Sequence, residues 1–286
     1  MDIRGNLYGA TLFGGGKGAN CNDLYGYCGT IFELSPPRAT AKSNVWTEKI
    51  LYNFEGVDTG DGGNPNGGLL FGKNGVIYGT TSIGGYDCPH NSGQGCGTLF
   101  SLSPPENDNS LWVESILHDF GYREDGGGPN GDLVFDSNGN LYGSTLGGGA
   151  GRIHSGIVFR FSPQPDGTFA ETILHSFDSG ADGGLPRAGV TFDKKGDLCG
   201  TATAGGTGGG TLFCILAKTR FFLAAYAWGP DPDGNYPNSV LKFDSTGNIY
   251  GTTLYGGTGQ ACNNYGCGTV FVISPTQAGS NDELIK

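Results

Sequence analysis

One eleven-residue phrase occurs five times in this chain, and its repetition limits the possible fold more than any other feature. The copies begin at residues 5, 75, 139, 196 and 247 and read GNLYGATLFGG, GVIYGTTSIGG, GNLYGSTLGGG, GDLCGTATAGG and GNIYGTTLYGG. Three further phrases recur around it in a fixed order. The chain is therefore five copies of one unit.

Each phrase has the residue types of a β-strand. Examples are CGTLFSLSPP at 96–105, LWVESILHDF at 111–120 and GDLVFDSNG at 131–139. They are rich in β-branched and aromatic residues and are bounded by Gly, Pro, Asn or Asp, whereas no long segment has a helical period. A tight FD-S-N-G-N turn or a near copy of it joins the last phrase of each unit to the next copy of the eleven-residue phrase. We therefore predict four antiparallel strands per unit, A to D, with strand A in the GDLVFDSNG-type phrase.

Four-stranded antiparallel units repeated around an axis are the blades of a β-propeller. We predict an all-β, five-bladed β-propeller whose first and last blades are incomplete. It forms a single domain over residues 1–286. The approximate repeats are 1–66, 67–130, 131–187, 188–238 and 239–286. A solenoid is the weaker alternative, because solenoid units are usually shorter and more even.

Composition excludes several classes of partner. The formal net charge is -11 and the sequence pI is about 4.6, which argues against nucleic acid and anionic membrane surfaces. No apolar run approaches the roughly 20 residues of a membrane helix, so we predict no membrane insertion. No secretory signal opens the chain, because its first residues already lie inside a repeat. Nothing in the sequence indicates an oligomeric state.

The elements DG-x-x-P, FD-x-x-GN-[LI]-YG-[TS]-T-x-x-GG and GT-[VLI]-F-x-[LI]-SP recur in that order over nearly the whole chain. This pattern closely resembles the GloVer-type tandem repeats of bacterial choice-of-anchor proteins. The resemblance implies an exported or surface-attached bacterial protein, and it implies no reaction. The fourth copy departs most from the pattern, with Cys199 in place of tyrosine and no Ser-Pro after its third strand.

Six of the eight cysteines lie in the B–C loops of three copies, as Cys21 with Cys28, Cys88 with Cys96, and Cys262 with Cys267. The same pair in the same place three times predicts three local disulfides. Disulfides indicate an extracellular or cell-surface location. Zinc is the alternative, although only Cys262 and Cys267 have the usual spacing. Cys199 and Cys214 fall on neighbouring strands, as a fourth bridge or as two buried thiols.

The D–A and B–C loops of a blade emerge on one face, and here they are long and varied, as working loops usually are. Every available D–A loop carries an Asp-Gly, at Asp61, Asp125, Asp182 and Asp233. Two such carboxyl groups, for example Asp125 with Asp182, would suit acid and base catalysis on a glycosidic bond. The structural alternative is stronger, because Asp-Gly followed by Pro is typical of a turn in which the carboxylate binds nearby backbone N–H groups.

Other loop residues are candidates for ligand contact. They are His90, His154, Arg152, Arg187, Tyr86, Tyr122, Tyr236 and Tyr255. Exposed tyrosine rings stack on sugar faces, and their hydroxyl groups bind sugar hydroxyls. In contrast, His118 and His175 share one place in strand D with Tyr52 and Tyr226, which indicates a repeated packing position.

We predict no cofactor and no metal centre, with calcium as an option. Asp58 with Asp61, and Asp231 with Asp233, offer oxygen ligands but complete no known calcium loop.

The sequence favours a secreted bacterial propeller that binds or processes carbohydrate on its loop-rich face. One alternative is a glycoside hydrolase or lyase with an Asp pair in the central pocket. Another is a surface protein-interaction scaffold without catalysis. Whether the protein is an enzyme stays open at this point, and a glycoside hydrolase is the expected class if it is one.

Overall fold

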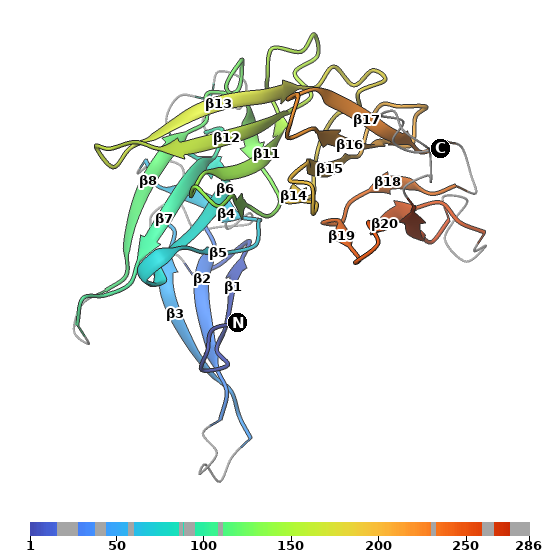
Figure 1. The fold of residues 1–286 in the computed structure, drawn as a ribbon. Helices are drawn as coiled ribbons and strands as arrows, with labels where there is room; N and C mark the ends of the chain where they lie inside the picture. The colour runs from blue at the N-terminus through green and yellow to red at the C-terminus, as the bar shows by residue number, and fades with distance from the viewer. Residues whose placement is uncertain are drawn as a thin grey trace. The chain divides into compact units, whose positions relative to one another are not determined.

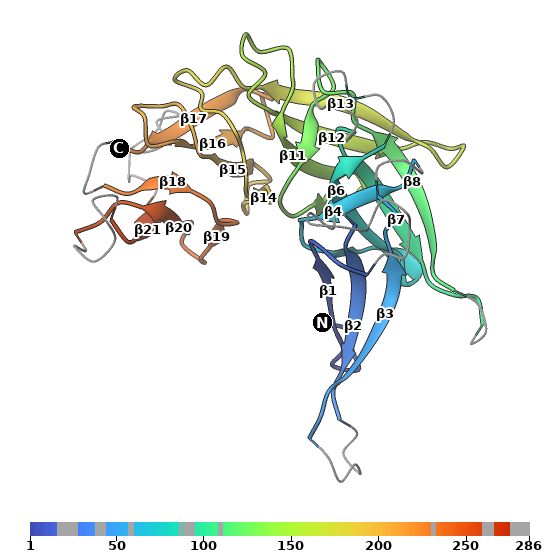
Figure 2. The same ribbon diagram turned by 180° about the vertical axis from the view of Figure 1, so that it is seen from behind.

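A computed structural model describes residues 1–15, 28–37, 44–56, 60–85, 88, 95–107, 111–229, 233–258 and 266–274. Its regular structure is almost entirely β-strand, in five antiparallel sheets that follow one another along the chain (Figures 1 and 2). We call these sheets blades one to five. A short 3-10 helix, η2 (Lys73–Gly75), occupies the A–B turn of blade two. None of the described helices has the length and apolar character needed to cross a membrane.

The strands alternate with the turns and loops that the repeat predicts. Blade one contains β1 (Leu7–Thr11), β2 (Thr30–Ser35) and β3 (Thr47–Asn53). Blade two contains β4 (Gly62–Pro65), β5 (Leu70–Phe71), β6 (Ile77–Gly84), β7 (Thr98–Ser103) and β8 (Val113–Asp119). Blade three contains β9 (Gly127–Pro129), β10 (Val134–Phe135), β11 (Leu141–Gly147), β12 (Ile157–Pro163) and β13 (Phe169–Ser176). Blade four contains β14 (Thr191–Phe192), β15 (Leu198–Ala202), β16 (Thr211–Ile215) and β17 (Phe222–Ala227). Blade five contains β18 (Asn235–Pro237), β19 (Lys242–Phe243), β20 (Ile249–Tyr255) and β21 (Val270–Ile273).

Strand A is divided into two short pieces in blades two, three and five, and the first piece begins at or just after the Asp-Gly turn that the DG-x-x-P phrase predicts. In blade three, β9 and β10 both pair with β11. The residue before the proline has a left-handed backbone, with φ of 55° at Asn64, 54° at Leu185 and 57° at Tyr236. Asn64 and Tyr236 lie inside the first piece, β4 or β18, and their left-handed conformation distorts the backbone there.

The glycine of the eleven-residue phrase is required by packing inside each sheet. Gly143 on β11 lies directly opposite Phe159 on β12. A Cβ atom on Gly143 would lie 2.5 Å from the ring atom Cζ of Phe159, closer than real Cβ atoms approach another atom. Gly9, Gly79, Gly200 and Gly251 face Phe32, Phe100, Phe213 and Phe271 in the same way. The recurring Tyr-Gly and Gly-Thr-x-Phe motifs are therefore two halves of one contact.

The chain divides into two compact units, Met1–Gly121 with blades one and two, and Tyr122–Lys286 with blades three to five. In the first unit, Ile31 and Phe54 share a buried cluster with Phe100 of the next blade. In the second unit, one cluster joins blades three and four, and another joins blades four and five. The predicted all-β fold of five antiparallel propeller blades, with the first and last incomplete, is confirmed. A single domain over residues 1–286 stays a prediction.

Candidate functional site

The D–A and B–C loops of a blade meet at one end of the sheet, as predicted. The backbone N–H of Gly85, which follows strand B of blade two, donates to the carbonyl oxygen of Asp61 in the D–A loop at 3.1 Å. Gly149 donates to Tyr122 at 3.1 Å, and Gly206 donates to Gly180 at 2.8 Å, in blades three and four. The loop-rich face is therefore fixed by backbone hydrogen bonds in each of these blades.

The Asp-Gly carboxylates bind the backbone of their own loops. Asp61 is buried, and its two oxygens accept hydrogen bonds from Glu55 N and Gly62 N, both at 2.7 Å. Asp182 accepts from Asp178 N at 3.0 Å and from Gly180 N at 3.2 Å. Asp233 accepts from Gly229 N at 2.9 Å. This is the geometry expected of a structural turn residue.

A side chain of strand D completes each turn. The hydroxyl of Tyr226 donates to Asp233 at 2.9 Å, and that of Tyr52 lies 3.3 Å from Asp61 Oδ2. His175 Nε2 lies 3.1 Å from Asp182 Oδ2. The His175 ring stacks on Phe222 of the next blade, with the two ring centroids 3.6 Å apart. Burial lowers the pKa of His175 despite the nearby carboxylate, so the neutral ring donates from Nε2. The repeated packing position is thus also a polar anchor for the loop.

Two glutamates that the sequence analysis did not select join this arrangement. Glu114 on β8 accepts a hydrogen bond from the Tyr52 hydroxyl at 3.0 Å, and it also lies against Asp61. Burial, and then the charge of Asp61, raise the pKa of Glu114 to about 9. In the second unit, burial and a hydrogen bond to Asp125 raise the pKa of Glu171 to about 9. In each pair, burial beside a second carboxyl group therefore favours the protonated form of the glutamate.

The sequence carried a signal for these pairs. Glutamate recurs at one position of the third phrase, as Glu48, Glu114 and Glu171, and the fourth copy has Phe222 there. The predicted catalytic pair has different partners in the structure, because Asp125 lies against Glu171 and Asp182 against His175.

Aromatic rings form pairs on the loop-rich face of two blades. In blade five, Tyr236 and Tyr255 are 43% and 37% exposed, and their ring centroids are 5.5 Å apart at an interplanar angle of 82°. In blade three, the rings of Tyr122 and His154 are 6.0 Å apart at 49°. Each pair joins a D–A residue to a residue at or beyond the end of strand B. The structure therefore brings predicted ligand-contact residues together as two separate pairs, one in blade three and one in blade five.

The other predicted contact residues are not part of these two ring pairs. Arg152 and Arg187 are exposed, and Arg152 lies two residues before His154. Its backbone N–H donates to Asp178 Oδ1 at 2.6 Å. Tyr86 and His90 lie outside the described residues.

A repeat-family model covers most of the chain. The family of the Gloeobacter/Verrucomicrobia repeat matches residues 1–206 and 88–282. The chain belongs to this repeat family. No curated protein sequence matches it.

Several solved glycosidase structures are similar to this Gloeobacter/Verrucomicrobia repeat protein at low sequence identity. An exo-1,5-α-L-arabinanase from a bovine ruminal metagenomic library is 12% identical, over 89% of this chain and 91% of that one, with a TM-score of 0.39. An α-L-arabinanase from Cellvibrio cellulosa, complexed with arabinohexaose, is 13% identical over 90% and 91%, with a TM-score of 0.37. A glycosyl hydrolase from Bacteroides ovatus is 12% identical over 91% and 85%, with a TM-score of 0.35. The function of the repeat protein is therefore argued from its own residues.

Disulfides connect the B–C region within blades of the repeat protein. The predicted Cys88–Cys96 bridge is confirmed, and Cys199–Cys214 forms a bridge rather than two thiols. Cys28 and Cys267 are also disulfide-bonded, whereas Cys21 and Cys262 lie outside the described residues. For Cys88 and Cys96 the disulfide excludes the zinc alternative.

Calcium stays untested at the two aspartate pairs of the repeat protein. Asp58 and Asp231 both lie outside the described residues. The carboxylates of their companions Asp61 and Asp233 accept hydrogen bonds from backbone N–H groups and tyrosine hydroxyls.

Proposed function

We propose that this protein binds neutral carbohydrate, outside the cell or at its surface, through the aromatic rings of its loop-rich face. The pair of Tyr236 and Tyr255 carries the proposal, because two large rings at nearly right angles are both more than a third exposed. Such a corner offers one ring face for stacking against a sugar and two hydroxyl groups for hydrogen bonds to it.

The rings stand on a rigid base. The backbone N–H of Tyr236 donates to Gly209 O of blade four at 3.0 Å, and Asn235 pairs with Tyr255 in the sheet. A side chain held in its bound position loses little freedom when the ligand arrives. The second pair, Tyr122 with His154, adds Arg152 nearby as a hydrogen-bond donor for sugar hydroxyls.

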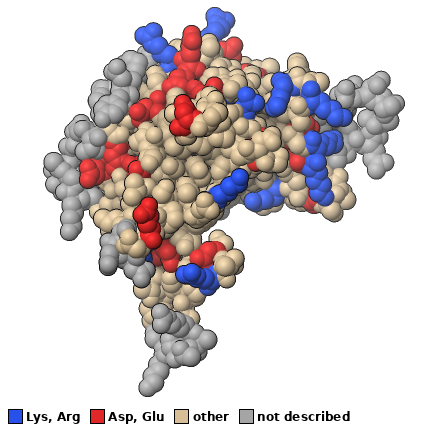
Figure 3. Space-filling model, turned by 60° about the vertical axis from the view of Figure 1, so that its left-hand side comes forward, with Lys and Arg blue, Asp and Glu red and all other residues tan. Residues whose placement is uncertain are grey.

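Surface charge and disulfides support the same ligand class and location. On the face shown in Figure 3, most of the surface is uncharged, and both acidic and basic side chains are present on it. That surface suits a neutral polymer better than a polyanion. Two confirmed disulfides fit an oxidising compartment, as expected for a bacterial protein that is secreted or attached to the cell surface.

Binding without catalysis explains the Asp-Gly carboxylates better than hydrolysis does. The oxygens of Asp61 and Asp182 accept hydrogen bonds from their own loops, and the same turn recurs from blade to blade. A hydrolase would need one carboxylate near the substrate as a nucleophile or base.

The test is retention on a panel of neutral polysaccharides, measured by affinity gel electrophoresis, with released reducing ends assayed in parallel. The wild-type protein is expected to be retarded by at least one polysaccharide without releasing sugar. Tyr255→Ala and Tyr236→Ala are each expected to weaken that binding about ten-fold or more, since a contact tyrosine often contributes over 1.4 kcal/mol.

Leu254→Ala is the matched control, because Leu254 is also exposed, on the same strand, and its side chain points to the opposite side of the sheet. It is expected to bind like the wild type. Unchanged binding of both tyrosine variants would contradict the proposal. Release of reducing ends that Asp125→Asn abolishes would establish the hydrolase instead.

A further inference from the structure

The A–B turns of blades one, three and five share one side-chain arrangement. In blade three, Asp136 Oδ1 accepts hydrogen bonds from Asn138 N and Asn140 N, both at 2.9 Å. Its Oδ2 accepts from Asn140 Nδ2 at 2.7 Å and from the Tyr142 hydroxyl at 3.1 Å. Asp2 and Asp244 bind the equivalent groups. Each turn aspartate is therefore fully supplied with donors.

The tyrosine of this arrangement also fills the space beside the next blade. The Tyr142 ring contacts Phe192 edge to face, with centroids 5.1 Å apart. In the first unit, Tyr8 contacts Phe71 in the same way at 4.8 Å. In blades one and three, a phenol ring thus lies between the turn and the strand A phenylalanine of the blade that follows.

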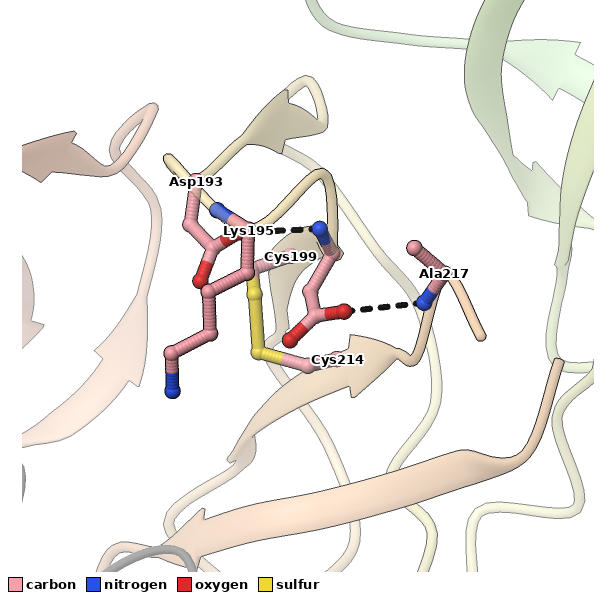
Figure 4. Close-up of a disulfide and its surroundings, with 6 residues drawn as sticks. Asp193, Lys195, Cys199, Cys214 and Ala217 are labelled. Carbon is pink, nitrogen blue, oxygen red and sulfur yellow. Dashed lines mark hydrogen bonds between the residues drawn. A yellow bond between two sulfur atoms is a disulfide. The ribbon is translucent and has the colours of Figure 1, made fainter. Parts of the chain in front are cut away.

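Blade four lacks both of the side chains, asparagine and tyrosine, that donate hydrogen bonds to the turn aspartate in blades one, three and five. Asp193 still accepts at Oδ1 from Lys195 N and Asp197 N, both at 2.8 Å, so the turn is intact. However, Asp197 replaces the asparagine, and Cys199 replaces the tyrosine. Within the part of the chain that the structure describes, Asp193 Oδ2 accepts no hydrogen bond. A disulfide from Cys199 to Cys214 on the neighbouring strand stands there in place of the phenol ring (Figure 4).

A cavity of about 230 Å³ occurs where the phenol ring is missing. One wall is Phe243, which is the blade-five counterpart of Phe71 and Phe192, and Ile249 and Ile273 extend the apolar lining. The disulfide, Asp193 and Asp197 line the cavity from blade four, with Lys195 beside them. The space therefore combines an apolar interior with a carboxylate that has a free acceptor.

We propose that this cavity binds a single phenolic ring supplied by a small molecule. The ligand's ring takes the place of the tyrosine ring against Phe243, and its hydroxyl donates to Asp193 Oδ2, as Tyr142 donates to Asp136. A lining of phenylalanine, isoleucine and disulfide favours a planar aromatic ring over a sugar, whose many hydroxyl groups would lose their hydrogen bonds to water there. The site lies at the A–B turns and is separate from the loop-rich face.

The test is titration with p-cresol, which is the tyrosine side chain as a free molecule, followed by NMR chemical shifts of the intact protein. Saturable binding is expected, with a dissociation constant on the order of 1 mM for so small a ligand. The shifts are expected at Phe243, Ile249 and Ile273. p-Xylene, which has a methyl group in place of the hydroxyl, is expected to bind at least about ten-fold more weakly, because it cannot donate to the carboxylate.

Two variants separate this site from nonspecific binding. Cys199→Tyr with Cys214→Val gives blade four the tyrosine and valine found at Tyr250 and Val272 of blade five, and it is expected to abolish p-cresol binding. Asp193→Asn keeps an oxygen acceptor for the turn and removes the charge, so it is expected to weaken binding about ten-fold while the fold is retained. Absence of saturable binding to the wild type, or equal binding to the filled variant, would overturn the proposal. Unchanged binding to Asp193→Asn would overturn the role of the carboxylate.

Discussion

Replacing Phe159 by alanine is expected to lower the free energy of unfolding by about 3–5 kcal/mol, which is the usual cost of removing a fully buried phenylalanine. Phe159 has no exposed surface and packs over Gly143 and against Phe161, so no neighbour can fill the space without moving a strand. Unfolding in urea, monitored by fluorescence, measures the change. Phe221→Ala is the control, because Phe221 is 63% exposed, and its effect is expected to stay within about 0.5 kcal/mol.

The partner glycine gives a sharper form of the same prediction. Gly143→Ala places a Cβ atom against the ring of Phe159 and is expected to destabilise by about 1–3 kcal/mol through overpacking. In the Phe159→Ala background the ring is absent, so the same substitution is expected to cost at least about 1 kcal/mol less. Strictly additive effects would show that the two motifs do not form one contact.

This contact also shows which parts of the fold could be predicted from sequence. The strands containing Gly143 and Phe159 were predictable because their residue types and the turn chemistry of Asp136 recur in order. In contrast, β9 was not predicted as a strand, because its three residues, which include the left-handed Gly128, have no strand period. Its pairing with β11 depends on the blade as a whole.

The candidate site was predictable residue by residue but not as an arrangement. Tyr236 and Tyr255 were selected as aromatic residues of the predicted loop-rich face, and the register of β18 with β20 brings their rings together. Cys199 was recognised as a departure from the repeat. The cavity beside Cys199 could not be predicted from the sequence. The tyrosine that Cys199 replaces contacts a phenylalanine of the following blade, as Tyr142 contacts Phe192, and that contact depends on how the blades pack.

The buried acid pair predicts an unusual dependence of stability on pH. Burial and the charge of Asp61 raise the pKa of Glu114 to about 9, whereas a glutamate in an unfolded chain titrates near 4.5. Between these values the folded protein holds a proton that the unfolded chain releases. The free energy of unfolding is therefore expected to fall as pH rises through this window, by up to about 1.4 kcal/mol per pH unit for one such group.

Glu114→Gln is expected to remove this contribution, because the amide is neutral at every pH and can still donate toward Asp61. The variant is expected to exceed the wild type in stability by at least about 1 kcal/mol at pH 8, and the two should converge below about pH 4.5. Glu171→Gln is expected to change the pH dependence of stability in the same way, because Glu171 lies against Asp125. Urea unfolding at several pH values measures both.

Glu48 supplies the matched control for this measurement. It occupies the same position of the repeat in blade one, but its side chain is exposed and borders no preceding blade in the described chain. Glu48→Gln is therefore expected to leave the pH dependence of unfolding unchanged. If Glu114→Gln had the same slope against pH as the wild type, Glu114 would be ionised in the folded protein, and the proton would not be part of the link between Tyr52, Asp61 and Glu114. If the slope is smaller than in the wild type, a proton shared with Asp61 stabilises the junction of blades one and two, and this Asp-Gly carboxylate serves the scaffold that holds the loops.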